Sequence, residues 1–224
     1  MADDRGQGPE APELPVPTTH RLSDGTLVRI RPVTRDDRDR LRNGFARLSA
    51  ESRYRRFLAA PATLSESTLD YLTGTDGWNH LAIGAELAAP GADTSYGLGI
   101  ARYVRLEDDP AKAEAAVAVI DEVQRRGLGR LLLRELICAA HERGVTTFVC
   151  HVLPSNEPVK TMLQEVDAQA TPHLRDGLLV YELRLAEVLP EVLPDARDQG
   201  PIYRILRLAA EGLRVIFPRL SKET

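Results

Sequence analysis

Two glycines separated by a single residue, Gly127 and Gly129, mark the stretch that most constrains the fold of this chain. An apolar run rich in valine and alanine precedes them at residues 115–123, and a segment with leucine and alanine at helical spacing follows at residues 131–143. This order predicts a buried strand, a tight turn and an amphipathic helix. Glycine lets the backbone approach a ligand closely, and the free N–H groups of a first helical turn favour an anion. The sequence therefore predicts a phosphate-binding turn at residues 124–130.

The residues around the two glycines do not fit the common nucleotide-binding motifs. A dinucleotide fingerprint requires a third glycine at the position of Leu132. A nucleotide P-loop requires lysine and then serine or threonine where Arg130 and Leu131 stand. Two interpretations remain at this point: a site for another phosphate-bearing ligand, or an ordinary glycine turn that starts a helix.

The remaining pattern, Gln-x-x-Gly-x-Gly at residues 124–129, resembles the pyrophosphate-binding turn of the GNAT superfamily of acyl-CoA-dependent N-acyltransferases. The strand before it, the helix after it and the strand that ends at Val152 are similar to the coenzyme-binding half of these enzymes. Residues 23–32 and the run Ser-Arg-Tyr-Arg-Arg-Phe at residues 52–57 resemble the bacterial protein lysine acetyltransferase branch. Together these features cover residues 20–185.

Hydrophobic periodicity and turn residues predict short strands and helices along this range. The strand, helix and strand around the glycine turn form a parallel crossover unit. With the resemblance, the elements indicate an α/β fold of the α+β type: a mixed, mostly antiparallel sheet with a central parallel strand–helix–strand crossover and splayed strands, flanked by helices. Strands are expected at residues 27–31, 80–86, 96–106, 114–123, 146–152, 171–174 and 178–185, and helices near residues 34–48, 49–57, 65–72, 131–143 and 157–165.

The chain is expected to divide into three parts. Residues 1–19 hold four prolines and almost no large apolar side chains, which predicts a flexible tail before an acetyltransferase domain at residues 20–185. Residues 186–224 form an extension in which apolar residues at helical spacing predict an amphipathic helix. We expect this helix to pack on its own domain or on a partner subunit, as in a homodimer. The alternative is that the basic face at residues 200–217 attaches to a membrane surface.

Composition narrows the class of protein. The net charge is −4, and the first nineteen residues hold four acidic side chains against one arginine, so the body is nearly neutral, which argues against a nucleic-acid binder. No run approaches the roughly 18 apolar residues of a membrane span, and the chain does not begin like a signal peptide, so we expect a cytoplasmic protein. Cys138 and Cys150 are expected to be buried free thiols. The histidines show no metal-ligand spacing, so no metal is expected.

The resemblance implies acetyl-CoA as the acyl donor and assigns its contacts residue by residue. The pyrophosphate would lie on the backbone N–H groups of the glycine turn, and the pantetheine arm would pair with the edge of the preceding strand. Asn156 matches an asparagine that contacts the coenzyme in this family, and its alternative role is to cap the short helix that follows. The turn residues are Arg125, Arg126, Gly127, Leu128, Gly129 and Arg130, and the strand residues are Val117, Ala118 and Val119.

Acyl transfer to an amine needs a base, because a protonated amine cannot attack a thioester. Glu114 stands where the family often carries this carboxylate, and its alternative role is that of a solvated residue at a strand end. Five strand residues, roughly 16 Å, separate Glu114 from Val119, so we expect the proton to pass through water. A backbone N–H of the strand would stabilise the oxyanion. Leu163 occupies the register of the family's usual tyrosine, which leaves the general acid unassigned.

The expected activity is transfer of an acetyl group from acetyl-CoA to a primary amine. The resemblance makes a protein lysine the favoured acceptor. A small-molecule amine is an alternative, because the acceptor segments around residues 54–57 and 78–80 do not specify a pocket. A module that senses acyl-CoA without turnover is a third hypothesis, motivated by the missing tyrosine.

Overall fold

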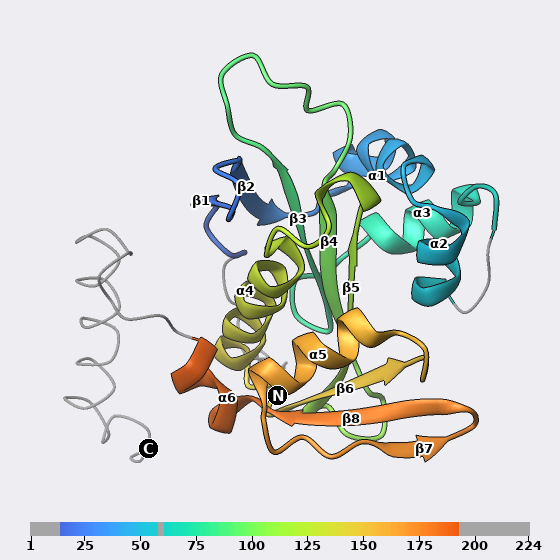
Figure 1. Ribbon diagram of the computed structural model, residues 1–224, viewed down its shortest axis with the longest axis vertical. Helices are drawn as coiled ribbons and strands as arrows, with labels where there is room; N and C mark the ends of the chain where they lie inside the picture. Colours follow the sequence, from blue (N-terminus) through green and yellow to red (C-terminus); the bar gives the residue numbers. More distant parts are fainter. Residues whose placement is uncertain (1–13, 58–60, 193–224) are drawn as a thin grey trace, which may run out of the picture. The chain divides into compact units, whose positions relative to one another are not determined.

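Eight strands form a mixed sheet in the computed structural model, which describes residues 14–57 and 61–192. The order across the sheet is β1-β2-β3-β4-β5-β6-β8-β7 (Figure 1). Among these strands β5 and β6 form the one parallel pair, and the other pairs are antiparallel. The strands are β1 (Thr18–Arg21), β2 (Leu27–Pro32), β3 (His80–Leu87), β4 (Gly99–Arg105), β5 (Lys112–Val119), β6 (Thr147–Val152), β7 (His173–Arg175) and β8 (Leu178–Arg184).

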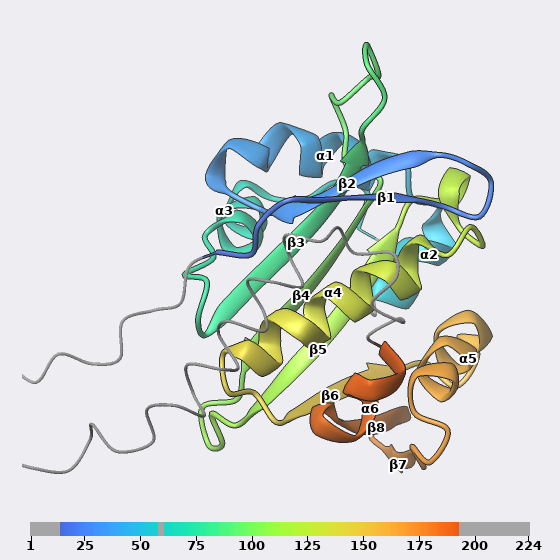
Figure 2. The same cartoon turned by 90° about the vertical axis from the view of Figure 1, so that its left-hand side faces the viewer.

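Helices cover both faces of this sheet. The long helix α4 lies across one face, while α1, α2 and α3 lie on the opposite face (Figures 1 and 2). This arrangement confirms the expected α/β fold with helices flanking a mostly antiparallel sheet. The helices are α1 (Arg38–Ala46), α2 (Ala50–Phe57), α3 (Glu66–Thr73), α4 (Leu128–Glu142), α5 (Glu157–Val166) and α6 (Leu185–Val192), with 3-10 turns η1 (Arg35–Asp37) and η2 (Asp121–Val123).

The core lies between α4 and the central strands. Leu81 and Tyr103 on the sheet, and Leu132 and Leu136 on α4, are fully buried. The helical spacing of the leucines therefore places one face of α4 on the sheet, as predicted. Gly99 allows the close approach, because a Cβ atom there would lie 2.9 Å from Cδ1 of Leu132.

Strands β5 and β6 separate after a short stretch of pairing. The parallel register runs from Lys112 opposite Thr147 to Glu114 opposite Val149. Beyond this point β5 continues beside β4 as far as Val119, whereas β6 continues beside β8, and the two strands diverge in Figure 1. The edge of β5 after Glu114 therefore has no strand partner on its β6 side among the described residues. This is the splay that the resemblance implies.

The strand expected at residues 114–123 is too long. It ends at Val119, and a 3-10 turn follows. The Asp121 carboxylate accepts hydrogen bonds from the Ser49 backbone N–H (2.8 Å) and the Ser52 hydroxyl (2.8 Å), which tie this turn to the start of α2. Ile120 and Val123 are buried, as residues at a strand end would be, so periodicity could not separate this turn from a strand.

The first and last described elements bear on the expected division of the chain into three parts. Strand β1 includes Thr18 and Thr19, which the sequence assigned to the tail, because both pair with β2. Helix α6 begins directly after the last strand. Residues 1–13 of the expected tail and the amphipathic helix expected at residues 200–217 lie outside the described residues.

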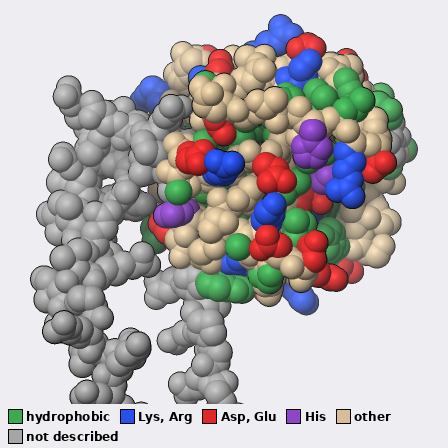
Figure 3. Space-filling view, turned by 90° about the horizontal axis from the view of Figure 1, so that it is seen from below, with side chains coloured by type: hydrophobic (Ala, Val, Ile, Leu, Met, Phe, Trp, Pro, Cys, Tyr) green, Lys and Arg blue, Asp and Glu red, His purple; other side chains and the backbone are tan. Residues whose placement is uncertain are grey.

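Two further properties of the described chain concern membrane crossing and surface charge. Its helices are too short and too polar to cross a membrane. On the face shown in Figure 3, acidic and basic side chains are interspersed, as expected for a body of nearly neutral charge.

A buried charge network joins β2, β3 and the start of α1. Arg31 contacts Asp37 (2.6 Å) and Glu86 (3.0 Å), and Arg40 contacts Asp37 at 3.0 Å. The side chains of Asp37 and Glu86 are each 6% exposed. Burial alone would raise the pKa of Asp37, but hydrogen bonds from Arg31, the Thr34 backbone N–H and Arg40 hold this pKa well below its usual range. The network therefore stabilises the charged form of Asp37 in the folded protein.

Replacement of Asp37 by asparagine should lower the free energy of unfolding by about 3 kcal/mol, because Arg31 and Arg40 lose their shared carboxylate. The contribution of Asp37 is complete above its unfolded pKa of about 4 and is lost as the pH falls through the lower folded pKa. Urea unfolding at several pH values should therefore show a weaker acid dependence in D37N than in the native chain. The matched control is D39N, which removes an exposed carboxylate. Equal losses in D37N and D39N would contradict the stabilising role of the network.

Candidate active site

The glycine turn adopts a left-handed backbone at two positions. Gly127 precedes α4 with φ 87°, and Arg125 has φ 60°. Leu131 is the first residue of the helix to donate a backbone hydrogen bond, to the Gly127 carbonyl at 3.0 Å. Within the described part of the chain, the N–H groups of residues 125–130 have no hydrogen-bond acceptor. Successive free N–H groups at a helix N-terminus form a concave anion-binding site.

Two of the three arginines in the turn have internal partners. Arg126 contacts Asp24 at 2.6 Å and also donates to the Glu122 carbonyl at 2.6 Å. Arg130 pairs with Glu165 on α5. Arg125 is exposed and forms no ion pair with the described residues. The turn is therefore fixed by Arg126 and Arg130, while the Arg125 side chain stays available to a bound anion.

Leu128 and Gly129 connect this turn to the body of the protein. The Leu128 side chain is 1% exposed and belongs to the core, so only its backbone is left to contact a ligand. A Cβ atom on Gly129 would lie 3.7 Å from Cγ2 of Val119 and 3.6 Å from the sulfur of Met162. The turn thus borders directly on the end of β5.

Substitution of Gly127 by alanine should weaken coenzyme A binding about tenfold, because a left-handed alanine is strained and realigns the free N–H groups. Gly144 supplies a matched control, since it has φ 78° and, like Gly127, no atom within 4 Å of an added Cβ. Both variants should lose about 1 kcal/mol of stability, but only G127A should lose affinity in isothermal titration calorimetry. Unchanged affinity of G127A would exclude the turn as the phosphate site.

The free edge of β5 runs from the splay towards the turn. Ala113 and Ala115 are buried, whereas Val117, Ala118 and Val119 are partly exposed. Exposure thus increases along β5 where β6 departs. The Val119 carbonyl accepts a hydrogen bond from Nε2 of Gln124 at 3.0 Å, so the last residue of this edge already has an internal partner.

Asn156 lies at the start of α5 and is only 7% exposed. Its side chain does not cap this helix, and it has no hydrogen-bond partner among the described residues. The absence of a cap bond argues against the capping role and leaves the amide available to a ligand.

Substitution of Asn156 by alanine should weaken coenzyme A binding about tenfold, because a bound ligand would lose a buried amide partner. The thermal midpoint should change little, since the folded chain has no cap bond to lose. Calorimetric titration and thermal unfolding measure the two effects separately. A lower midpoint with unchanged affinity would restore the capping role.

Glu114 occupies the vertex of the splay. It is the last residue of β5 to pair with β6, and its side chain is 57% exposed. One carboxylate oxygen lies 3.9 Å from Nδ1 of His151 on β6. The register of β5 with β4 is continuous from residue 113 to 119, so no bulge shortens the roughly 16 Å between Glu114 and Val119. A proton reaching Glu114 from a group beside Val119 would therefore travel through water.

Leu163, which replaces the family's usual tyrosine, is 1% exposed on α5. It provides no proton donor. Cys150 is buried, and burial raises its pKa to about 12, so this thiol stays protonated near neutral pH.

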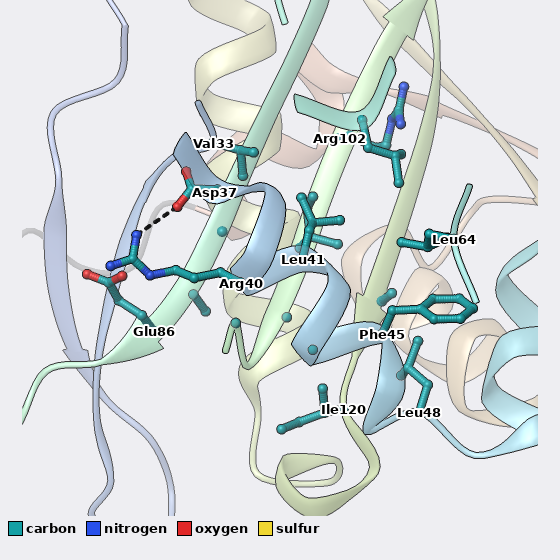
Figure 4. Close-up of a pocket in the computed structure, with 18 of the residues that line it drawn as sticks. Val33, Asp37, Arg40, Leu41, Phe45, Leu48, Leu64, Glu86, Arg102 and Ile120 are labelled. Carbon is teal, nitrogen blue, oxygen red and sulfur yellow. Dashed lines mark hydrogen bonds and ion pairs between the residues drawn. The ribbon is translucent and has the colours of Figure 1, made fainter. Parts of the chain in front are cut away.

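A cavity of about 90 Å³ lies between α1–α3 and the sheet, on the same face as Glu114. Its lining is mainly apolar and includes Ala118 of β5 (Figure 4). Four arginines also line it: Arg31, Arg40, Arg56 and Arg102.

The sequence pointed to some of this cavity but not to Arg102. The segments 54–57 and 78–80 were named as acceptor regions, and the first contributes Arg56 and Phe57 to the lining. Arg102 is 5% exposed and stands within the apolar strand β4. A single charged residue between apolar neighbours was the available signal for this site.

A splayed strand pair beside a free helix N-terminus, with a cavity on the opposite face, defines the architecture of an acyl-CoA-dependent N-acetyltransferase domain. The model of the GNAT acetyltransferase domain matches residues 28–169. The chain belongs to this family, as its sequence predicted.

Curated relatives support the same classification. The chain is 35% identical over 123 residues to the acetyltransferase PA5475 of Pseudomonas aeruginosa, covering 55% of this chain and 64% of the relative. It is 31% identical over 154 residues to the acetyltransferase Pat of Mycolicibacterium smegmatis, covering 69% of this chain and 44% of the relative. The chain thus spans less than two thirds of the length of either relative.

Solved structures share the fold. The GNAT domain of S. lividans PAT superposes with a TM-score of 0.69 at 29% identity, covering 77% of this chain and 99% of that domain. The acetyltransferase yncA of Salmonella typhimurium, solved with its cofactor acetyl-CoA, superposes with a TM-score of 0.55 at 18% identity, covering 75% of this chain and 98% of that one. The second likeness concerns the fold alone.

Proposed function

We propose that this chain transfers an acetyl group from acetyl-CoA to a primary amine. The observation that carries the proposal is the left-handed turn before α4, where six successive backbone N–H groups are free beside the open edge of β5. This arrangement suits a ligand with a phosphate group at one end and amide groups along an extended arm. Acetyl-CoA has both features.

In this proposal the backbone of residues 125–130 binds the pyrophosphate, with Arg125 as an added cation. The pantetheine arm pairs along Val117, Ala118 and Val119, and the Asn156 amide supplies a further contact. Family membership and the uncapped, buried state of Asn156 support these roles.

The reaction forms a C–N bond and breaks the C–S bond of the thioester. Glu114 receives the amine proton through water, so that the neutral amine attacks the carbonyl. A backbone N–H of β5 stabilises the oxyanion, and the departing thiolate takes its proton from water. The exposed position of Glu114 at the splay supports this water route.

The favoured acceptor is a protein lysine. The run at residues 52–57 and the 31% identity to the acetyltransferase Pat support this choice. The cavity between α1–α3 and the sheet favours a second candidate, a small-molecule amine held on the same face as Glu114. The buried Leu163 motivates a third, an acyl-CoA sensor without turnover.

The central test measures thiol release from acetyl-CoA across a panel of proteins and small amines. Substitution of Glu114 by glutamine should lower kcat about a hundredfold without changing affinity for coenzyme A, because the proton acceptor is lost. The matched control is E187Q, which removes an exposed carboxylate on α6. Equal rates for E114Q and the native chain would remove Glu114 from its role. Tight binding without turnover on any acceptor would favour the sensor.

A further inference from the structure

Two arginines with no acidic partner share the cavity with two that are neutralised. Arg31 and Arg40 pair with Asp37 or Glu86 at one end, where Figure 4 shows Arg40, Asp37 and Glu86 together. Arg102 lies apart from this group in the same view. Neither Arg56 nor Arg102 has an ion-pair partner within the described chain.

Among the described residues no carboxylate lies at ion-pair distance from Arg102, and the more distant charge of Glu114 only partly offsets the burial that lowers the pKa of Arg102. The residue is 5% exposed, and its guanidinium carbon lies 4.6 Å from the centre of the Tyr71 ring. Arg56 lies over the Phe57 ring at 5.0 Å. Burial lowers the pKa of Arg56 to about 10, and the charge of Arg102 adds to this effect. A buried cation beside a second, partly buried one is costly unless an anion completes the site.

His80 is another buried polar residue near Arg102, and one of its ring nitrogens lacks a hydrogen-bond partner among the described residues. His80 lies two residues before Ala82 on β3, and Ala82 is opposite Arg102 on β4. The side chains of His80 and Arg102 therefore project from the same face of the sheet. The residue is 9% exposed, and its Nε2 atom is buried without a hydrogen-bond partner. Burial and the charge of Arg102 lower the pKa of His80 to about 4, so the ring is neutral near pH 7 and does not add a third positive charge.

The proposed base lies next to these groups. Glu114 is opposite Val104, and Arg102 is opposite Ala116, so Glu114 and Arg102 are diagonal neighbours on the same face, with Cα atoms roughly 7–8 Å apart. The Glu114 carboxylate lies beside His151 and is largely exposed, so its charge offsets only part of the cost of burying Arg102. An amine beside Glu114 and an anion beside Arg102 would thus be a few bonds apart in one molecule.

We propose that Arg56 and Arg102 bind a carboxylate of the acceptor, so that the preferred acceptor is an amine with a carboxylate a few bonds away. This inference rests on the proposed transfer function. A planar carboxylate matches the fork of a guanidinium, and Nε2 of His80 offers a further hydrogen bond. The carboxylate comes either from a free amino acid or from an acidic residue next to a lysine.

The test compares kcat/KM for acceptors that differ only in the carboxylate. Amino acids are assayed beside their decarboxylated amines, and a Glu-Lys peptide is assayed beside a Gln-Lys peptide. The native chain should prefer the carboxylate-bearing member of a pair at least about tenfold. R102Q and R56Q should abolish the preference, and R184Q, which changes an exposed arginine, should retain it. If the preference appears with the amino acids, the carboxylate belongs to the free amino acid, and if it appears with the peptides, it belongs to the neighbouring acidic residue.

A variant that retains the charge separates recognition from folding. R102K keeps a cation but loses the guanidinium fork, so it should lose most of the preference while its thermal midpoint and coenzyme A affinity stay native. If R102Q does not fold, R56Q and R102K decide the question.

Other outcomes overturn the proposal. Equal rates on both members of every pair would exclude a carboxylate site, while leaving the transferase function intact. An arginine-dependent preference for succinyl-CoA over acetyl-CoA would assign the carboxylate to the acyl group instead. If no acceptor turns over, the transferase proposal fails, but the carboxylate site can still be tested. Calorimetry then compares the binding of lysine and of 1,5-diaminopentane to the coenzyme A-loaded protein. Tighter, arginine-dependent binding of lysine supports the site, and equal binding excludes it.

Discussion

The separation of β5 from β6 is the constraint on which the rest of the structure depends. Parallel pairing stops at Glu114 and Val149, because β8 continues to hold β6 while β4 continues to hold β5. Backbone groups on the free edge of β5 then need a different partner. Gln124 satisfies one of them, at Val119, and the proposed pantetheine arm would satisfy others. The same separation places Glu114 at the vertex, where water reaches its carboxylate.

Charge is organised differently on the two sides of the cavity. Asp37 and Glu86 neutralise arginines where β2, β3 and α1 meet, so these charges serve stability. Arg56 and Arg102 have the same chemistry and no such partners in the described chain. Burial of a charge without a counter-ion costs stability, and such a cost is typical of a site that is completed by a ligand. The cavity thus has one end where paired charges stabilise the fold and another end where Arg56 and Arg102 lie near the proposed base.

Local patterns account for much of the fold. The strand, glycine turn and helix around Gly127 follow from periodicity and from the backbone freedom of glycine, and the buried leucines of α4 match the predicted stripe. The Ser65 cap of α3 also follows from its sequence and accepts a hydrogen bond from the Thr68 N–H. The strand expected up to residue 123 failed because Asp121 bonds to Ser49 and Ser52, more than sixty positions away. Such distant contacts leave no mark on the local pattern.

For the site, the sequence by itself determined the turn as a candidate, because glycine spacing and element order are local properties, and its resemblance to the GNAT superfamily added the strand edge and Asn156. It left the role of Asn156 open, and only the tertiary structure showed that its side chain makes no cap bond. The tertiary structure also decided which charges are neutralised. Arg31 forms an ion pair with Glu86, and Arg102 forms none within the described chain, because strand register and helix packing determine which distant side chains become neighbours.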